Sequence, residues 1–108
     1  MKVVFTGRIL PGKTARVEQW AEEVQGRWAS ENTAFNRQAG IREESVFISP
    51  TPDGDIMVIV HEVDDLQHYD QALSAWSGPF AEWWLSEARE ALGEVTDTRG
   101  RRIVHWSQ

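Results

Sequence analysis

The chain of 108 residues contains no cysteine, and this absence excludes disulfide bonds, thiolate nucleophiles and cysteine zinc sites. Positive charge is scarce, because 11 Lys and Arg stand against 17 Asp and Glu, for a formal net charge of −6. Nucleic acids and anionic membranes attract basic surfaces, so we expect neither as a partner. No apolar run approaches the roughly 20 residues that cross a bilayer, and the first residues show no signal-peptide pattern. These absences predict a cytoplasmic protein that folds as one domain over residues 1–108.

Several short motifs of known chemistry are also missing. Gly7 and Gly12 stand alone, so the chain has no glycine-rich loop for phosphate, and no G-x-S-x-G motif supports a serine nucleophile. The three histidines, His61, His68 and His105, lie at no recognisable metal-ligand spacing. We therefore expect neither a metal ion nor a cofactor.

Tryptophan is abundant where other residue types are scarce: the chain has six tryptophans and one tyrosine, Tyr69. A tryptophan side chain combines a large apolar area with one hydrogen-bond donor, and suits cores, interfaces and pockets for flat ligands. Two interpretations stay open at this point. The tryptophans could form the core and a dimer interface, or they could line a pocket for an aromatic ligand.

Residue periodicity predicts a mixed α and β chain. Alternation over 2–10 indicates a half-buried strand, and a helical stripe begins after Thr14 as N-cap. This stripe can run to residue 39, with a break near Gly26 or Ser30 and an end at Gly40. Strands are expected at 41–49 and 55–63, joined as a hairpin by a turn at 53–54.

The second half of the chain predicts two more helices and a strand. Asp64 or Asp65 can cap a helix that extends to about residue 76, and a second helix covers 80–92. We expect a polar linker over 93–100 and a final strand over 102–106. The order β-α-β-β-α-β is that of an α+β, ferredoxin-like protomer with an antiparallel sheet and helices on one face. The other sheet face would be apolar and uncovered, which predicts a homodimer whose two sheets pack together.

At this point the chain resembles the dimeric α+β barrel superfamily, which includes antibiotic-biosynthesis monooxygenases that need no cofactor and small polyketide cyclases and dehydratases. The resemblance extends over nearly the whole chain and rests on element order, length and four short stretches: 42–47 (REESVF), 51–55 (TPDGD), 61–65 (HEVDD) and 78–84 (GPFAEWW). The same stretches also resemble an uncharacterised branch of small bacterial proteins. No catalytic motif is shared across the superfamily, so the resemblance assigns no residue a role.

Strand parity sorts the side chains onto two sheet faces. The face expected to pack on the helices is apolar: Val3, Phe5, Gly7, Ile9, Val46, Ile48, Ile56, Val58, Val60 and Val104. The opposite face, which a dimeric barrel would enclose, is expected to place polar residues among apolar Phe47, Met57 and Ile59: Thr6, Arg8, Glu43, Ser45, His61 and His105. A concave apolar space with a few polar groups is the default ligand site.

His61 is the expected general acid or base, because an unperturbed imidazole exchanges protons near neutrality. Glu43 or Glu62 could orient it or act as a base, and Arg8 or Tyr69 could stabilise a developing enolate or phenolate oxygen. The expected substrate contacts come from both the sheet and the helices: Ser45, Phe47, Ile59, His105, Trp28, Asn32 and Trp84.

The leading functional hypothesis is an enzyme of secondary metabolism that uses no cofactor. It would bind a hydrophobic, aromatic, polyketide-like small molecule and promote cyclisation or dehydration by acid–base chemistry. The resemblance implies this reaction class, whereas the residues themselves indicate only a pocket. A monooxygenase of phenolic substrates and a dimeric binding protein without catalysis are the alternatives.

Overall fold

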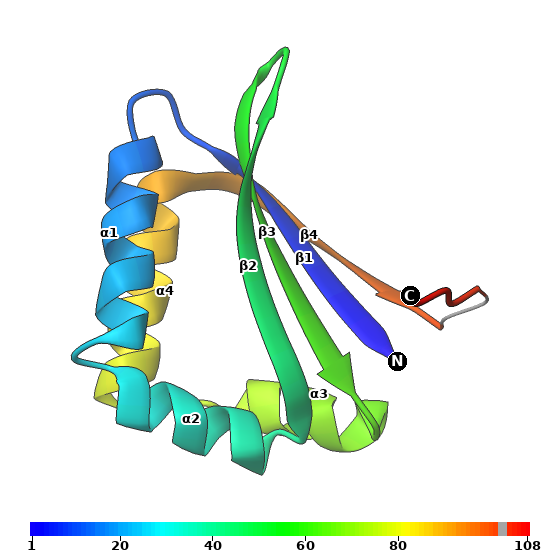
Figure 1. The fold of residues 1–108 in the computed structure, drawn as a ribbon. Coiled ribbons are helices and arrows are strands. Elements are labelled where there is room, and N and C mark those ends of the chain that lie inside the picture. Colours follow the sequence, from blue (N-terminus) through cyan, green and yellow to red (C-terminus); the bar gives the residue numbers. More distant parts are fainter. Residues whose placement is uncertain (102–103) are drawn as a thin grey trace.

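The computed structural model describes residues 1–101 and 104–108 and contains four strands and four helices in that part of the chain. In chain order they are β1 (Lys2–Ile9), α1 (Thr14–Gln25), α2 (Ala29–Gln38), β2 (Ile41–Thr51), β3 (Gly54–Val63), α3 (Leu66–Ala75), α4 (Pro79–Ala91) and β4 (Leu92–Gly100). The strands form one antiparallel sheet in the order β2-β3-β1-β4. The helices gather on one side of this sheet (Figure 1). The predicted α+β, ferredoxin-like architecture is confirmed.

Local sequence signals explain most of the helix ends. Gly26 interrupts the first helical stripe and separates α1 from α2. Gly40, with a φ of +74°, takes the left-handed conformation that ends α2 and starts β2. Asp65 caps α3, because its side chain accepts a hydrogen bond from the His68 backbone N–H.

The predicted cap of α1 is wrong. The helix begins at Thr14 itself, and Lys13 takes the N-cap position without a side-chain hydrogen bond. The Thr14 hydroxyl instead donates to Asp55 at 2.8 Å, which ties the start of α1 to the start of β3. The Thr14 hydroxyl therefore contacts a residue distant in sequence and does not form the helix cap that the local sequence predicted.

The last strand lies earlier in the chain than predicted. The expected linker over 93–100 is strand β4, whereas 104–106 lie outside any strand and 102–103 fall outside the described residues. Val95, Thr96 and Thr98 are β-branched and suit a pleated edge strand. Thr96 lies opposite Thr6 in β1, and their hydroxyls are hydrogen-bonded at 2.8 Å. The strand was not predicted because its polar composition is typical of a linker.

The predicted parity of β3 is also wrong. Residues directly opposite one another in an antiparallel pair project to the same face, and β1 pairs with β3 through Val3–His61, Phe5–Ile59 and Gly7–Met57. Met57, Ile59 and His61 are buried on the helix side, and Ile56, Val58 and Val60 lie on the outer face. Periodicity could not detect this, because β3 is aliphatic on both faces from Ile56 to Val60. The predicted inner positions in β1, together with Val46 and Ile48 in β2, match the pairing register.

The core divides into two buried clusters on the helix side of the sheet. The first joins α1 and α4 to the sheet through Ile9, Val17, Trp20, Met57, Ile59, Ala91 and Leu92. The second joins α2 and α3 to the other end of the sheet through Val3, Ala39, Ile41, Val63 and Tyr69. Among the described residues, no helix is long and apolar enough to cross a membrane.

Candidate functional site

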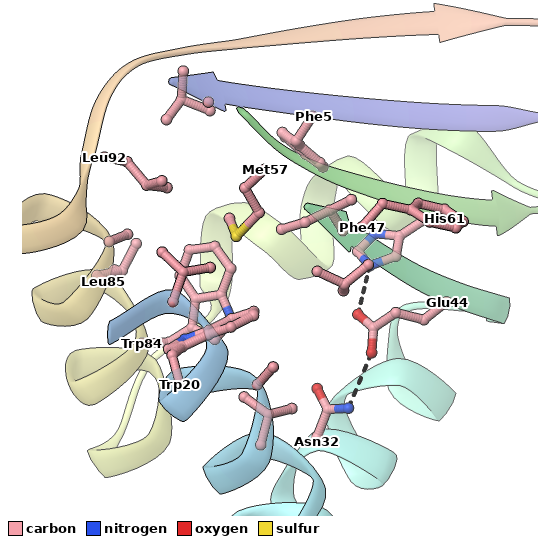
Figure 2. Close-up of a pocket in the computed structure, with 18 of the residues that line it drawn as sticks. Phe5, Trp20, Asn32, Glu44, Phe47, Met57, His61, Trp84, Leu85 and Leu92 are labelled. Carbon is pink, nitrogen blue, oxygen red and sulfur yellow. Dashed lines mark hydrogen bonds and ion pairs between the residues drawn. The ribbon is translucent and has the colours of Figure 1, made fainter. Parts of the chain in front are cut away.

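A cavity of about 910 Å³ lies between the sheet and the helical layer. Figure 2 shows its walls: Phe5 and Met57 extend from the sheet, and Trp20, Trp84 and Leu92 face them. Its size falls within the range of small-molecule sites. The cavity therefore lies on the helix-facing side of the sheet within one chain, and not on the face that was expected to be enclosed by a dimer.

Tryptophans on the helices form one wall of this cavity. Trp20 of α1 meets Trp84 of α4 edge to face, with ring centroids 5.4 Å apart. Trp84 also contacts Trp76, with ring centroids 5.8 Å apart, and Trp76 contacts Phe80, with ring centroids 5.6 Å apart. Offset and edge-to-face aromatic contacts of this kind are stabilising. The tryptophans thus serve as core and cavity wall together, and the two interpretations of their abundance do not exclude each other.

His61 is the buried polar residue at one end of the cavity, with 7% of its surface exposed. Its ring is hydrogen-bonded on both sides: Nε2 to a Glu44 carboxylate oxygen and Nδ1 to the Tyr69 hydroxyl, each at 2.7 Å. A carboxylate only accepts hydrogen bonds, so the His61 Nε2–H donates to Glu44. In a neutral ring Nδ1 is then the acceptor, and the Tyr69 hydroxyl donates to it. The imidazole is fixed in one orientation and one tautomer.

Glu44 is the second member of this polar end, and its side chain is 24% exposed. Asn32 and Asn36 of α2 donate to its other oxygen at 3.0 and 3.1 Å. Burial by itself would raise the pKa of Glu44, but hydrogen bonds from His61, Asn32 and Asn36 outweigh burial and hold this pKa at about 2. A carboxylate offers about four acceptor positions. Three are filled here, so one remains for a donor on a ligand.

Tyr69 lies behind the imidazole and does not line the cavity. Its side chain is fully buried, and this burial raises its pKa, so the hydroxyl keeps its proton near neutrality. Its hydroxyl is hydrogen-bonded to His61 and does not reach the cavity. In this arrangement Tyr69 orients the imidazole.

The predicted site residues divide into two groups. His61, Asn32, Ile59 and Trp84 line the cavity, and Phe47 borders it at the edge strand β2 with 53% of its surface exposed. The remaining predicted residues, apart from Tyr69 behind His61, do not line it: Arg8, Glu43, Ser45, His105 and Trp28.

The reasons for these corrections differ. Arg8, Glu43 and Ser45 lie on the outer face as predicted, but that face does not carry the cavity or His61. His105 is exposed in the segment after β4. Trp28 packs instead against Phe80, with ring centroids 5.3 Å apart.

Sequence reasoning did not single out Glu44, although a signal for it was present. Val46 and Ile48 were assigned to the inner face, and alternation extends that face back to Glu44. A register irregularity between Ile41 and Glu43 lets buried Ile41 share this face despite its odd number. Glu44 was overlooked because polar residues were sought on the opposite face.

The described residues contain no cluster of three or more histidines and carboxylates that could hold a metal ion. His61 is committed to Glu44 and Tyr69, and the His68 ring is hydrogen-bonded to the Gln38 carbonyl at 2.6 Å.

No protein-family model and no curated protein matches the chain. Solved structures do share its fold. A dimeric ferredoxin-like protein from an uncultured marine organism superposes with a TM-score of 0.67 at 11% identity, over 99% of this chain and 97% of that chain. A NIPSNAP family protein of unknown function from Agrobacterium tumefaciens gives a TM-score of 0.64 at 13% identity, over 90% and 82%.

A third neighbour is SnoaB, a cofactor-independent oxygenase from Streptomyces nogalater, with a TM-score of 0.54 at 15% identity, over 95% and 94% of the two chains. At these identities the likeness is one of fold. The ferredoxin-like protomer fold that the resemblance implied is confirmed.

Proposed function

We propose that the cavity binds a flat, hydrophobic aromatic molecule and that Glu44 and His61 perform acid–base chemistry on it without a cofactor. One observation carries this proposal: a buried imidazole is hydrogen-bonded to a partly exposed carboxylate at the end of a cavity whose other walls are largely apolar. Perturbed ionisable groups in a large apolar pocket are typical of active sites.

The geometry assigns different roles to the two residues. Both ring nitrogens of His61 are occupied, whereas Glu44 keeps one free acceptor position. A ligand hydroxyl or enol that reaches this position would lose its proton to Glu44 and become a phenolate or enolate. Entry of the ligand removes water from Glu44 and raises its pKa towards that of a useful base. In a cyclisation, the enolate carbon attacks a carbonyl carbon of the same molecule, and the π electrons of that carbonyl move to its oxygen as an alkoxide. The Glu44 carboxyl group then returns the proton to this alkoxide.

Asn32 and Asn36 supply the remaining polar groups. Each amide nitrogen has two N–H groups and uses one of them on Glu44. The other can donate to a developing oxyanion on the ligand. The tryptophan wall would hold the aromatic body in one orientation, and orientation alone can remove several kcal/mol of a barrier.

Cyclisation or dehydration is the first candidate reaction, and oxygenation of a phenolic substrate is the second. The fold shared with a cofactor-independent oxygenase favours the second candidate. Oxygen uptake during incubation with an electron-rich polyphenol separates them. Product formed equally under air and under nitrogen would contradict oxygenation.

The binding proposal is tested by quenching of tryptophan fluorescence with a naphthol and with a hydroxylated anthraquinone. We expect saturable quenching by both, and loss of most turnover in Glu44→Gln. Glu43→Gln is the matched control, because Glu43 is adjacent in sequence but lies on the outer face. Saturable binding with no turnover of any polyphenol would favour a binding protein without catalysis.

We also propose that the chain forms a homodimer through the outer sheet face. Val4, Val58 and Val60 lie there half-buried. In the part of the chain that the structure describes, the helices all lie on the other side of the sheet (Figure 1). Apolar sheet faces are normally covered, and a structural neighbour is a dimeric ferredoxin-like protein. Light scattering should give twice the chain mass for the unaltered protein and the single mass for Val58→Asp. A monomeric unaltered protein would contradict the dimer.

A further inference from the structure

The charged side chains that line the cavity are all acidic in the part of the chain that the structure describes. They are Glu44 at the polar end and Glu18 and Glu22 on α1; no lysine or arginine joins them. Glu18 and Glu22 are exposed, lie one helical turn apart, and form no ion pair among the described residues. The cavity therefore has negative charge at its mouth and at its inner end.

Two arginines, one in α1 and one just after it, have partners outside the cavity. Arg16, at the start of α1, is paired with Glu87 of α4 at 2.8 Å. Arg27, just after α1, lies over the rings of Trp28 and Trp83, with its guanidinium carbon 4.9 and 5.5 Å from their centroids. Neither side chain lines the cavity, so neither offsets the charge of Glu18 and Glu22 there.

The inner end lacks a positive group for an anion as well. His61 donates to Glu44 and accepts from Tyr69, so its ring has no free N–H when neutral. Glu44 presents a carboxylate oxygen with one open acceptor position, which suits a hydroxyl. A ligand carboxylate placed there would face a like charge in a partly desolvated site, where repulsion is stronger than in water.

We propose that this cavity selects uncharged, hydroxyl-bearing aromatic molecules and excludes aromatic carboxylates and phosphates. The proposal rests on the proposed function, because it specifies the ligand class of the same cavity. It implies that an acid group on a precursor must be removed or esterified before the molecule can enter.

Three probes of nearly equal shape test the charge: a naphthol, a naphthalene carboxylate and the methyl ester of that carboxylate. At neutral pH we expect the naphthol to bind most tightly, as judged by quenching of tryptophan fluorescence, because only its hydroxyl can donate to Glu44. The ester should bind more weakly than the naphthol, and the carboxylate roughly tenfold more weakly than the ester, because Glu18, Glu22 and Glu44 repel its charge.

Variants separate the inner charge from the mouth. Glu44→Gln should bring the affinity for the carboxylate close to that for the ester, whereas the control Glu43→Gln should leave the ratio of the two affinities as it is in the unaltered protein. Glu18→Gln with Glu22→Gln should raise the association rate of the carboxylate at low salt, and the gain should vanish at high salt, where exposed charges are screened.

Equal affinity for the ester and the carboxylate, or tighter binding of the carboxylate, would overturn the charge selection and leave the aromatic pocket intact. Failure of all three probes to bind would count against the proposed function itself. If Glu44→Gln does not fold, as judged by circular dichroism, the comparison of the three probes on the unaltered protein still decides the matter.

Discussion

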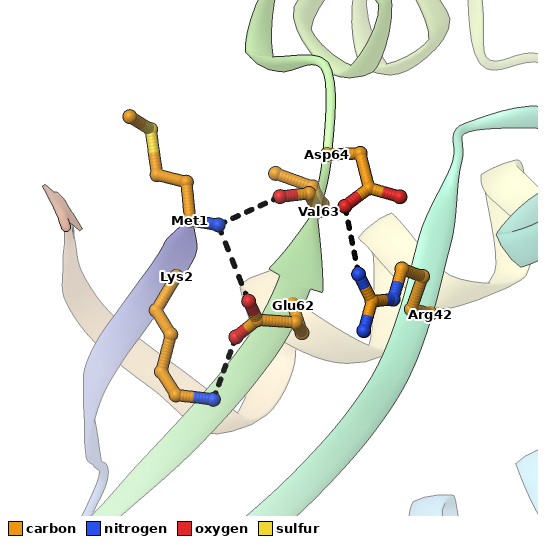
Figure 3. A network of polar contacts seen from close by, with 6 residues as sticks. All are labelled: Met1, Lys2, Arg42, Glu62, Val63 and Asp64. Carbon is orange, nitrogen blue, oxygen red and sulfur yellow. Dashed lines mark hydrogen bonds and ion pairs between the residues drawn. The ribbon is translucent and has the colours of Figure 1, made fainter. Parts of the chain in front are cut away.

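Two glutamates near the same end of the sheet have the same lowered pKa for different reasons. Glu44 is on the cavity side, and hydrogen bonds from His61, Asn32 and Asn36 overcome its burial to hold its pKa at about 2. Glu62 is on the outer face, and its pKa is also about 2, because Lys2 and the Met1 amino group donate to it at 2.7 and 3.2 Å (Figure 3).

The difference lies in the chemistry of the partners. The two cations that balance the charge of Glu62 are exposed, although the Glu62 side chain itself is only 15% exposed, and water and salt weaken pairs with exposed cations. Amide groups and a buried imidazole hold Glu44, whose side chain is 24% exposed. Loss of the carboxylate would leave the buried His61 Nε2–H without an acceptor, and unmade hydrogen bonds of buried groups are costly.

Low pH should have the largest effect on the free energy of unfolding. The folded-state pKa of Glu44, about 2, is below the ordinary value of 4.5, so its stabilisation is present above pH 4.5 and is lost as the pH falls to about 2. The shift corresponds to at most about 3 kcal/mol, and partial solvent exposure reduces it. Urea unfolding from pH 6 to 2 should show this loss in the unaltered protein and a smaller loss in Glu44→Gln, which keeps the contribution of Glu62. Parallel profiles would contradict the lowered pKa.

Replacement of each glutamate by leucine should have the second-largest effect on stability. Glu44→Leu leaves the His61 Nε2–H without its partner and should lower the free energy of unfolding by roughly 2 kcal/mol at neutral pH. The matched change Glu62→Leu removes a surface ion pair and should cost a small fraction of that amount. Chemical denaturation of both variants measures the difference. Equal losses would show that the inner network is no more demanding than the outer one.

Tyr69→Phe sharpens the comparison within the inner network. The change removes the donor to His61 Nδ1 and adds no volume, so we expect a loss of about 1 kcal/mol in stability. A positioning role further predicts a shifted pH profile of turnover with little change in KM, because the aromatic ligand does not touch Tyr69. An unchanged pH profile together with lowered stability would indicate a purely structural residue.

Salt should produce the smallest effect. Carboxyl titration followed by NMR at low and high ionic strength should show the Glu62 pKa rising towards its ordinary value as its cations are screened. The Glu44 pKa should move less, since hydrogen bonds from His61, Asn32 and Asn36, and not exposed cations, contribute most to lowering it. Equal salt responses would contradict the assignment of causes.

Much of the fold could be predicted from the sequence. Alternation identified β1, the turn at Asp53-Gly54 located the hairpin, and the break at Gly26 and the cap at Asp65 were confirmed. β4 was not predicted, because its threonines and charged residues are typical of a linker. Its strand character comes from pairing with β1, and this partner lies about 90 residues away in sequence.

The site was predictable in part. His61, Asn32, Ile59 and Trp84 were correctly associated with a pocket, but the wrong sheet face was assigned to it. β3 has aliphatic residues on both faces from Ile56 to Val60, and therefore has no periodicity from which the orientation of His61 could be inferred. Only the register Val3–His61 and Glu44–His61 determines that orientation.

The sequence by itself determined the element order, the helix breaks and the supply of aromatic side chains, because turns, caps and periodicity act over a few residues. Tertiary structure decided which of two neighbouring residues faces the cavity: Glu44 rather than Glu43, and His61 rather than Glu62. Successive strand residues point to opposite faces, so a shift of one residue in the strand register would move every side chain of that strand to the other face. The pairing of distant strands fixes that step, and with it the chemistry of the cavity.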